Sequence, residues 1–208
     1  MNFTLDAVYT KLLTLPGIIV GLSFHEFAHA WTSDRLGDPT PRRQGRLTLN
    51  PMAHIDWIGF IALLLVGFGW GKPVEINPSY YKNRRRDEFF VGIAGVTMNL
   101  LLAVLLAIPT RLLGGAYSTG SELMQSVYLI LLYAVMINLV LMIFNLIPCP
   151  PLDGWGLLTQ IFNLEKYDWW YTVYRNGTWI LLALILFNVT DRILTPAVDF
   201  LMRLLLRY

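Results

Sequence analysis

Charged residues are scarce in this sequence. They make up 14% of the 208 residues, whereas hydrophobic residues make up 55%. Because soluble domains contain about 25% charged residues, this composition argues against a soluble domain and indicates an integral membrane protein. The formal net charge of +2 is too small to suggest binding to nucleic acid, and we predict no nucleic-acid partner.

Cysteine and polar linkers are scarce as well. The chain has one cysteine, Cys149, which excludes a disulfide bond within the chain. Neither an internal repeat nor a low-complexity stretch divides the sequence. The first apolar run also lacks the basic leader and the small-residue cleavage site of a signal peptide. We therefore expect residues 1–208 to form a single membrane-embedded domain.

Long apolar runs contain most of the hydrophobic residues. A helix needs about 20 apolar residues to cross the hydrocarbon core of a bilayer, and three runs are long enough: 5–31, 89–113 and 127–147. Residues 178–189 are also apolar, and residues 193–206 either span the membrane or lie at its interface. We predict an all-α polytopic membrane protein with a bundle of about four to six transmembrane helices.

Two short segments alternate apolar with polar residues, namely 46–50 and 72–77. Such alternation is typical of β-strands, so we expect a small membrane-associated β element. Between them lies a short, glycine-rich apolar run, 57–70.

Basic residues cluster on both sides of the short run 57–70. Before it come Arg35, Arg42, Arg43 and Arg46, and after it come Lys72, Lys82 and Arg84 to Arg86. The positive-inside rule places both clusters in the cytoplasm, and a segment with both ends on one side cannot cross the membrane once. We therefore predict that 57–70 is re-entrant, that the loop 114–122 lies outside, and that Arg84 to Arg86 face anionic lipid.

Two of the three histidines stand in the motif His25-Glu26-Phe27-Ala28-His29, inside an apolar run. Residues four apart lie one above the other on a helix, so both imidazoles can bind one Zn²⁺. The carboxylate of Glu26 points to a neighbouring sector, from which it can reach a metal-bound water without ligating the metal. This arrangement suits hydrolysis, because zinc lowers the pKa of water to near 7 and a carboxylate can take its proton.

A catalytic zinc site usually has three protein ligands and one water, so a third ligand must come from elsewhere. Asp153, in the stretch NLIPCPPLDG, is the best acidic candidate. The alternative is that Asp153 caps the helix that follows, and the chemistry alone leaves both interpretations open. A thiolate of the nearby Cys149 is a further alternative. His54, in NPMAHID, is either a residue of the substrate gate or an interfacial or capping residue.

Four stretches in this order, HEFAHA, GRLTLNPMAHID, GWGKPVEINP and NLIPCPPLDG, resemble the site-2 protease family of intramembrane zinc metalloproteases, in its short prokaryotic form without a PDZ or CBS module. The resemblance extends from about Phe24 to Gly156. One departure concerns AGVTMN, which ends at Asn99, where members of the family often have AGPxxN. The missing proline bears on the bend of that helix and does not affect the metal site.

The resemblance implies roles for individual residues. His25, His29 and Asp153 would bind one zinc ion, Glu26 would be the catalytic acid and base, and Asn145 would stabilise the tetrahedral oxyanion. Asn138 is expected to bridge helices by hydrogen bonding.

The resemblance also implies a function. The expected activity is that of an endopeptidase that cleaves a peptide bond within or next to a transmembrane segment of a single-span membrane protein. Its location would be the inner (plasma) membrane of a prokaryote, as a multi-pass protein in a lipid bilayer, with the active site toward the cytoplasmic half. Alternatives are a zinc transporter, a metal-sensing membrane protein, or a catalytically inactive scaffold. The sequence specifies neither the substrate nor the oligomeric state.

Overall fold

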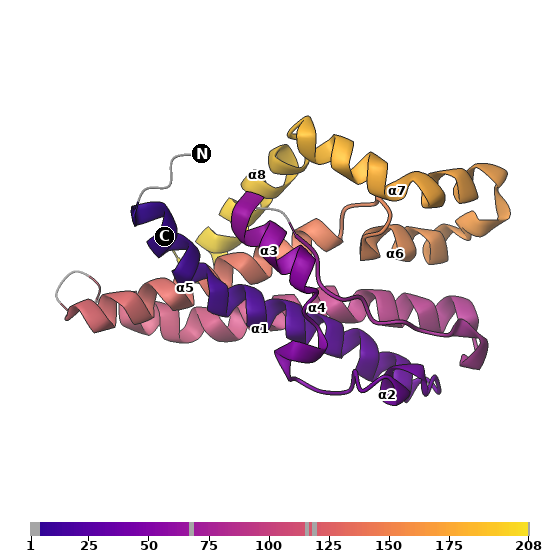
Figure 1. Cartoon of the computed structure of the whole chain (residues 1–208), viewed down its shortest axis with the longest axis horizontal. Coiled ribbons are helices and arrows are strands. Elements are labelled where there is room, and N and C mark those ends of the chain that lie inside the picture. The colour runs from indigo at the N-terminus through magenta and orange to yellow at the C-terminus, as the bar shows by residue number, and fades with distance from the viewer. Residues whose placement is uncertain (1–4, 67–68, 115–116, 118–119, 208) are drawn as a thin grey trace.

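The protein was analysed as a computed structural model, which describes residues 5–66, 69–114, 117 and 120–207. Figure 1 shows helices throughout these residues. The described part of the chain contains no β-strand, which confirms the all-α class and excludes the expected β element from that part.

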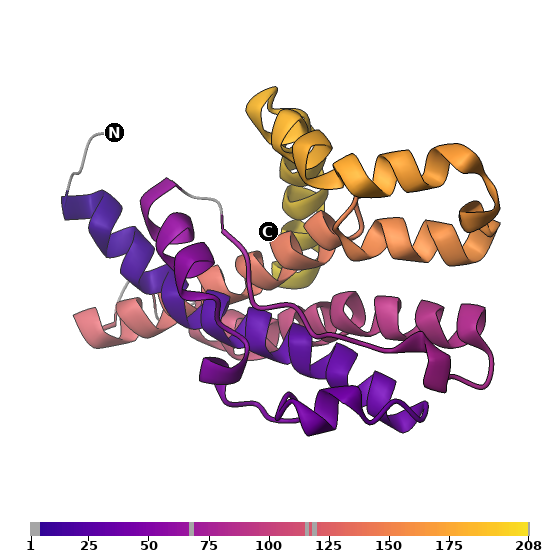
Figure 2. The ribbon, with the colours of Figure 1, turned by 45° about the vertical axis from the view of Figure 1, so that its right-hand side comes forward.

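Three long helices form the centre of the fold: α1 (Leu5–Arg35), α4 (Arg84–Gly114) and α5 (Glu122–Asn145). Each packs against the other two, and Figures 1 and 2 show them side by side. All three are long and apolar enough to cross a membrane. Small residues allow close approach: a Cβ atom added to Gly17 of α1 would lie 2.7 Å from the Cα atom of Ala134 in α5.

Helices α6 (Asp153–Phe162) and α7 (Asp168–Leu186) form a hairpin beside the first half of α4 (Figure 2). Helix α8 (Val189–Leu206) follows α7 after a bend of 70° and packs against α5. The described residues therefore give three candidate spans, or four if α7 and α8 form one broken span. Only the lower end of the expected range of four to six is reached.

Helix α3 (Trp57–Val66) lies at the end of a chain excursion whose two ends meet. Ile55 and Gly71 form an isolated antiparallel bridge, and the N–H of Lys72 donates to the carbonyl of His54 at 2.9 Å. The helix has 10 residues and is about 15 Å long, half of the roughly 30 Å thickness of a hydrocarbon core. This geometry suits a segment that enters and leaves on one side, and its re-entrant course in a bilayer stays a prediction.

The segment 72–77 has no regular secondary structure, although its sequence alternates. Lys72 N–H donates to the carbonyl of His54, and two further N–H groups of the segment are bound by carboxylates and not by a neighbouring strand. Val74 donates to Glu26 at 3.0 Å, and Asn77 donates to Asp38 at 2.7 Å. The alternation therefore predicted a strand wrongly, because side chains of the first helix and of the loop after it occupy the positions of a partner strand.

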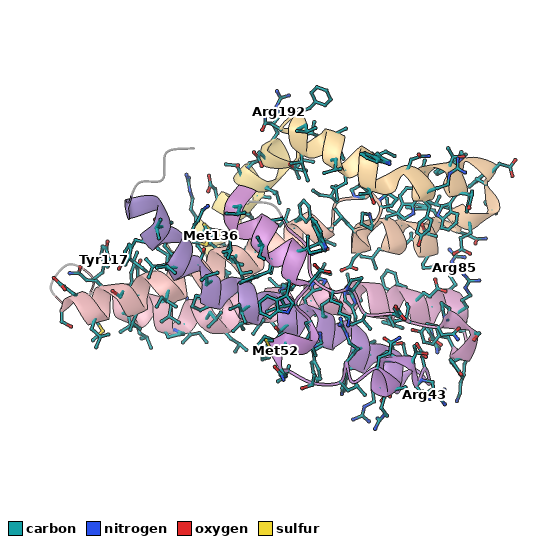
Figure 3. The ribbon with its side chains drawn as sticks, viewed as in Figure 1. Arg43, Met52, Arg85, Tyr117, Met136 and Arg192 are labelled. Atoms are coloured by element: carbon teal, nitrogen blue, oxygen red, sulfur yellow. The ribbon has the colours of Figure 1, made fainter. Side chains whose placement is uncertain are left out.

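The arginines at the start of α4 are exposed and also make contacts within the protein, and their predicted contact with anionic lipid stays a prediction. Arg84 pairs with Glu88 and Glu165, and Arg86 pairs with Asp87. Arg85 reaches toward α6 (Figure 3) and donates to the carbonyls of Gln160 and Ile161 near the C-terminal end of that helix. A cation at the C-terminal end of a helix interacts favourably with the helix dipole. These contacts fix α6 on α4.

The topology can be tested by cysteine labelling. In a Cys149→Ser background, Ser79→Cys should react with a membrane-impermeant maleimide only from the cytoplasmic face. Ser121→Cys should react only from the outer face, because α4 and α5 lead the chain across and back. Ser121 stands at the edge of the loop 114–122, of which residues 115, 116, 118 and 119 lie outside the described residues. Labelling of both cysteines from the same face would contradict this topology.

Candidate metal centre

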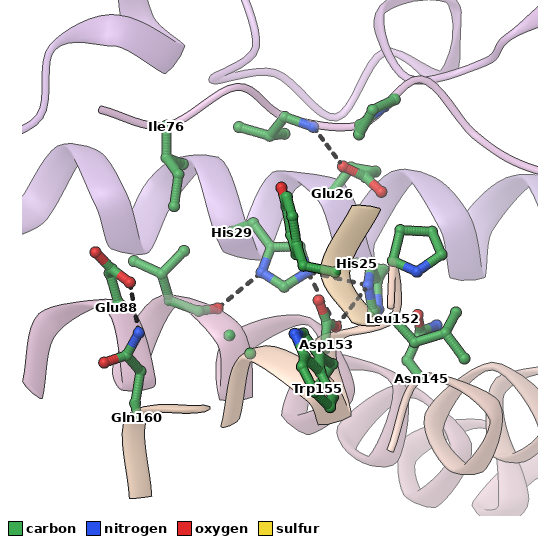
Figure 4. A pocket seen from close by; sticks show the side chains of 17 residues that line it. His25, Glu26, His29, Ile76, Glu88, Asn145, Leu152, Asp153, Trp155 and Gln160 are labelled. Carbon is green, nitrogen blue, oxygen red and sulfur yellow. Dashed lines mark hydrogen bonds and ion pairs between the residues drawn. The ribbon is translucent and has the colours of Figure 1, made fainter. Parts of the chain in front are cut away.

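Three side chains from two helices meet at one point. His25 and His29, one turn apart on α1, bring their Nε2 atoms to 3.0 Å from each other. Asp153, the first residue of α6, places its Oδ2 atom 3.2 Å from the His25 Nε2 atom and 3.3 Å from that of His29. Figure 4 shows the three side chains converging. The structure thus brings together the three residues that the sequence analysis named as ligands.

The hydrogen bonds behind the two imidazoles determine which nitrogens carry protons. His25 Nδ1 lies 2.7 Å from the side-chain oxygen of Asn99, and His29 Nδ1 lies 2.7 Å from the carbonyl of Val91. The amide nitrogen of Asn99 donates to Gly21 and Asn138, so its oxygen must face His25. Both Nδ1 atoms therefore donate, and both Nε2 atoms are left with bare lone pairs.

These atoms form a donor set that suits a cation. The two Nε2 lone pairs face Asp153 Oδ2, which is buried and has no hydrogen-bond partner among the described residues. Ligands at about 2.0–2.1 Å from a tetrahedral zinc ion are roughly 3.3 Å apart. The observed separations of 3.0–3.3 Å agree with this value. The residues present therefore fit a zinc ion with a fourth position open to the pocket.

The pocket beside the three ligands has a volume of about 440 Å³. It is lined by residues of α1, α4, α5, α6 and α7 and by the segment 73–76. The pocket has room for a water molecule and for a peptide next to the ligands.

Glu26 points into the same pocket and lies outside the group of three ligands (Figure 4). Its Oε2 atom accepts a hydrogen bond from Val74 N–H at 3.0 Å and lies 3.7 Å from Arg46 Nη2. The side chain of Arg46 is buried and also donates to the carbonyls of Ala53 and Lys72. Arg46 thus holds together the catalytic candidate Glu26 and both ends of the excursion that contains α3.

Asn145, the last residue of α5, lines the pocket as expected. In this structure its side-chain N–H donates to the carbonyl of Leu141 at 2.9 Å, within its own helix. This bond uses one of the two N–H groups of the amide, and the second remains to donate to a group bound in the pocket.

Two residues considered from the sequence lie apart from the ligands. Cys149 is buried, with its sulfur 3.9 Å from the carbonyl of Gly177, and it does not belong to the group of ligands. His54 is fully buried and bonds the carbonyl of Thr48 at 2.7 Å through Nε2. Burial lowers the pKa of His54. It is the C-cap of the short 3-10 helix Pro51–Ala53, and it does not cap the helix that follows: there Asp56 accepts the hydrogen bond from Gly59 N–H at 2.9 Å.

Sequence reasoning missed two supporting residues. Asn99 orients His25, whereas the sequence analysis noted it only as the last residue of AGVTMN and gave it no role at the metal site. Its hydrogen bond with Asn138 does confirm the predicted bridge between helices. Arg46 contacts Glu26, but in the sequence it was one basic residue of a charged loop. The signal that could have found Arg46 is its place in GRLTLNP, between two glycine- and proline-rich turns.

Gly95 allows α4 to approach the ligands. A Cβ atom at this position would lie 2.6 Å from His25 Cε1 and 2.7 Å from His25 Nε2. Gly92, one turn earlier, differs: there a Cβ atom would meet only the flexible end of Leu157, at 3.4 Å.

These two glycines provide a matched test of the site. We expect Gly95→Ala to displace the imidazoles and to lower the zinc content of the purified protein, as judged by elemental analysis. Gly92→Ala should keep its zinc, because its new methyl group has space. Equal zinc content in the two variants would contradict the placement of the ligands against α4.

Comparisons with known proteins match a peptidase family and proteins named as zinc metalloproteases. The model of Peptidase family M50 matches residues 110–186. A protein of Bacillus subtilis (strain 168) named "Putative zinc metalloprotease YwhC" is 39% identical over 151 residues, which are 69% of this chain and 66% of that protein.

Two mycobacterial proteins, each named "Putative zinc metalloprotease Rip2", are similar as well. The one from Mycolicibacterium smegmatis is 33% identical over 77% of this chain and 61% of its own length. The one from Mycobacterium tuberculosis (strain ATCC 25618 / H37Rv) is 31% identical over 71% of this chain and 56% of its own length. The chain thus spans between about half and two thirds of the length of these relatives. No solved structure matches the chain.

Proposed function

The chain belongs to peptidase family M50, the site-2 proteases, and on this basis we propose that it is a zinc endopeptidase that cleaves a peptide bond within or next to a transmembrane segment of another membrane protein. The observation that carries the proposal is the convergence of His25, His29 and Asp153 beside a carboxylate, Glu26, that is not part of the donor set. A site that only stores or transports zinc has no use for such a carboxylate.

One zinc ion bound by the three ligands would supply a Lewis acid for the scissile carbonyl and for the attacking water. The protein's own residues do the remaining work. Glu26 accepts the proton of the water and returns it to the leaving amine. Val74 N–H and Arg46 hold its carboxylate beside the ligands, so that little reorganisation is needed. Asn145 donates the second N–H of its side-chain amide to the oxyanion.

The pocket also offers a place for the substrate chain. A transmembrane helix hides its carbonyls in hydrogen bonds, so it must unwind before water can attack. Figure 4 shows the segment with Ile76 on one side of the ligands and α6 with Trp155 on the other. An extended peptide between them could pair with the segment 72–77 by strand addition.

The proposal includes the membrane setting. We propose a single-span membrane protein as substrate and the inner (plasma) membrane of a prokaryote as location. The two basic clusters between α1 and α4 support a cytoplasmic location for the ends of these helices, by the positive-inside rule. His25 and His29 lie in the half of α1 nearer to that end, so the active site opens toward the cytoplasmic half.

Glu26→Gln separates catalysis from metal binding. We expect this variant to keep its zinc, because Glu26 is not a ligand, and to lose cleavage of a single-span substrate in detergent, because the amide cannot accept a proton. Asp153→Ala should instead lose zinc. Cleavage by Glu26→Gln at a rate near that of the wild type would disprove the assigned mechanism.

Asn145→Ala tests the oxyanion donor. Loss of such a donor costs about 2.7–4 kcal/mol of transition-state stabilisation, or about 10²–10³ in kcat. We expect a decrease of this size with unchanged zinc content, measured on the same substrate. Turnover equal to that of the wild type would remove Asn145 from the reaction.

A further inference from the structure

The pocket continues beyond the metal centre, along α4 toward the N-terminal end of this helix. Its lining there consists of Val91, Gly92 and Glu88 of α4 and of Gly156 and Gln160 of α6. In Figure 4, Glu88 and Gln160 lie together on one side of the two histidines, and Asn145 lies on the other side. The pocket is therefore an elongated groove with the metal centre between its two ends.

The floor of this groove leaves room for a peptide. A Cβ atom added to Gly156 would meet no atom within 4 Å, and one added to Gly92 would meet only the end of a leucine side chain. Glycines on both facing helices thus keep the groove open between the ligands and Glu88.

The carboxylate of Glu88 is held in place at the end of the groove. Its Oε2 atom accepts from Gln160 Nε2 at 2.6 Å, and its Oε1 atom accepts from Arg84 Nε at 2.7 Å. Its side chain is 14% exposed, whereas that of Arg84 is 62% exposed. Each carboxylate oxygen has a second lone pair, so Glu88 can accept a further hydrogen bond from a group in the groove.

The charge of the groove is negative at this end. None of the described residues that line it is a lysine or an arginine. Of its carboxylates, Asp153 belongs to the donor set and Glu26 lies near the buried Arg46. The partner of Glu88, Arg84, is largely exposed, and solvent screening weakens an ion pair with an exposed partner. A cation that enters the groove can therefore share or replace this pairing at little cost.

The distance from the metal centre to Glu88 defines a position in the substrate. Gly95 lies at the level of the ligands, and Glu88 precedes it by seven residues, which corresponds to about 10.5 Å along the helix. An extended peptide advances about 3.3 Å per residue. The third residue from the scissile bond thus reaches Glu88.

We propose that Glu88 determines specificity, by selecting substrates that carry a lysine or arginine about three residues from the cleaved bond, on the cytoplasmic side. This inference rests on the proposed protease function. It agrees with the chemistry of single-span proteins, whose cytoplasmic flanks are rich in lysine and arginine. The enzyme would thus cleave near the cytoplasmic end of a transmembrane segment, where apolar residues give way to basic ones.

The experiment uses the purified, zinc-loaded chain in detergent and single-span substrates with one cleavage site. The substrates differ only at the third residue on the cytoplasmic side, which is Lys, Gln or Glu. We expect wild-type kcat/KM to be about two- to five-fold higher for Lys than for Gln, as a partly exposed ion pair allows, and lowest for Glu. Glu88→Gln should abolish this order, and Glu88→Lys should reverse it.

Glu165→Gln is the matched control. Glu165 also contacts Arg84, at 3.4 Å, but does not line the groove, so this variant should keep the wild-type order. A wild-type order that persists in Glu88→Lys would overturn the inference, as would equal cleavage of all three substrates by the wild type. In both results the protease function stands. A zinc-loaded wild type that cleaves none of them would overturn the proposed function and the inference with it.

Discussion

The structure depends on three electron-pair donors that face one another at 3.0–3.3 Å. Without a cation between them, two bare imidazole nitrogens and a carboxylate oxygen repel each other, and their burial strengthens this repulsion because the local dielectric constant is low. The fold therefore has to hold each donor from behind. Asn99 and the carbonyl of Val91, both on α4, fix the two rings, and the absence of a side chain at Gly95 lets that helix come close enough to do so.

The third donor is fixed from a distance. Asp153 lies at the first turn of α6, and the last turn of α6 is tied to α4 by Arg85. Gln160, near the same end, is bound to Glu88, and Thr159 accepts a hydrogen bond from Trp170 of α7 at 3.0 Å. A helix is stiff over ten residues, so contacts at one end determine where the other end lies. Arg85 at the start of α4 thus helps to position a metal ligand at the other end of α6.

The sequence revealed those parts of the site that depend on local geometry. The spacing of His25 and His29 on a helix was sufficient to place both rings on one face, because that follows from 3.6 residues per turn. Asp153 could be a ligand or a helix cap until the family resemblance favoured the first, because a contact between distant segments has no local signature. The prediction of a β element was wrong for a related reason. Alternation at 72–77 indicates which side chains share a face, but it does not indicate what will pair with the backbone.

That missing partner strand has a consequence for the reaction. The segment 72–77 is held by Glu26 at Val74 and by Asp38 at Asn77. Burial opposes the ionisation of Asp38, but hydrogen bonds from Thr40, Asn77 and Ser33 outweigh it and lower its pKa, so the anchor stays charged at neutral pH. Because Glu26 is itself one of the anchors, the segment that could hold the substrate and the group that takes the proton from water share a hydrogen bond. Any displacement of the segment by a bound peptide therefore moves or frees the carboxylate of Glu26, so that substrate binding and the readiness of the base are mechanically coupled.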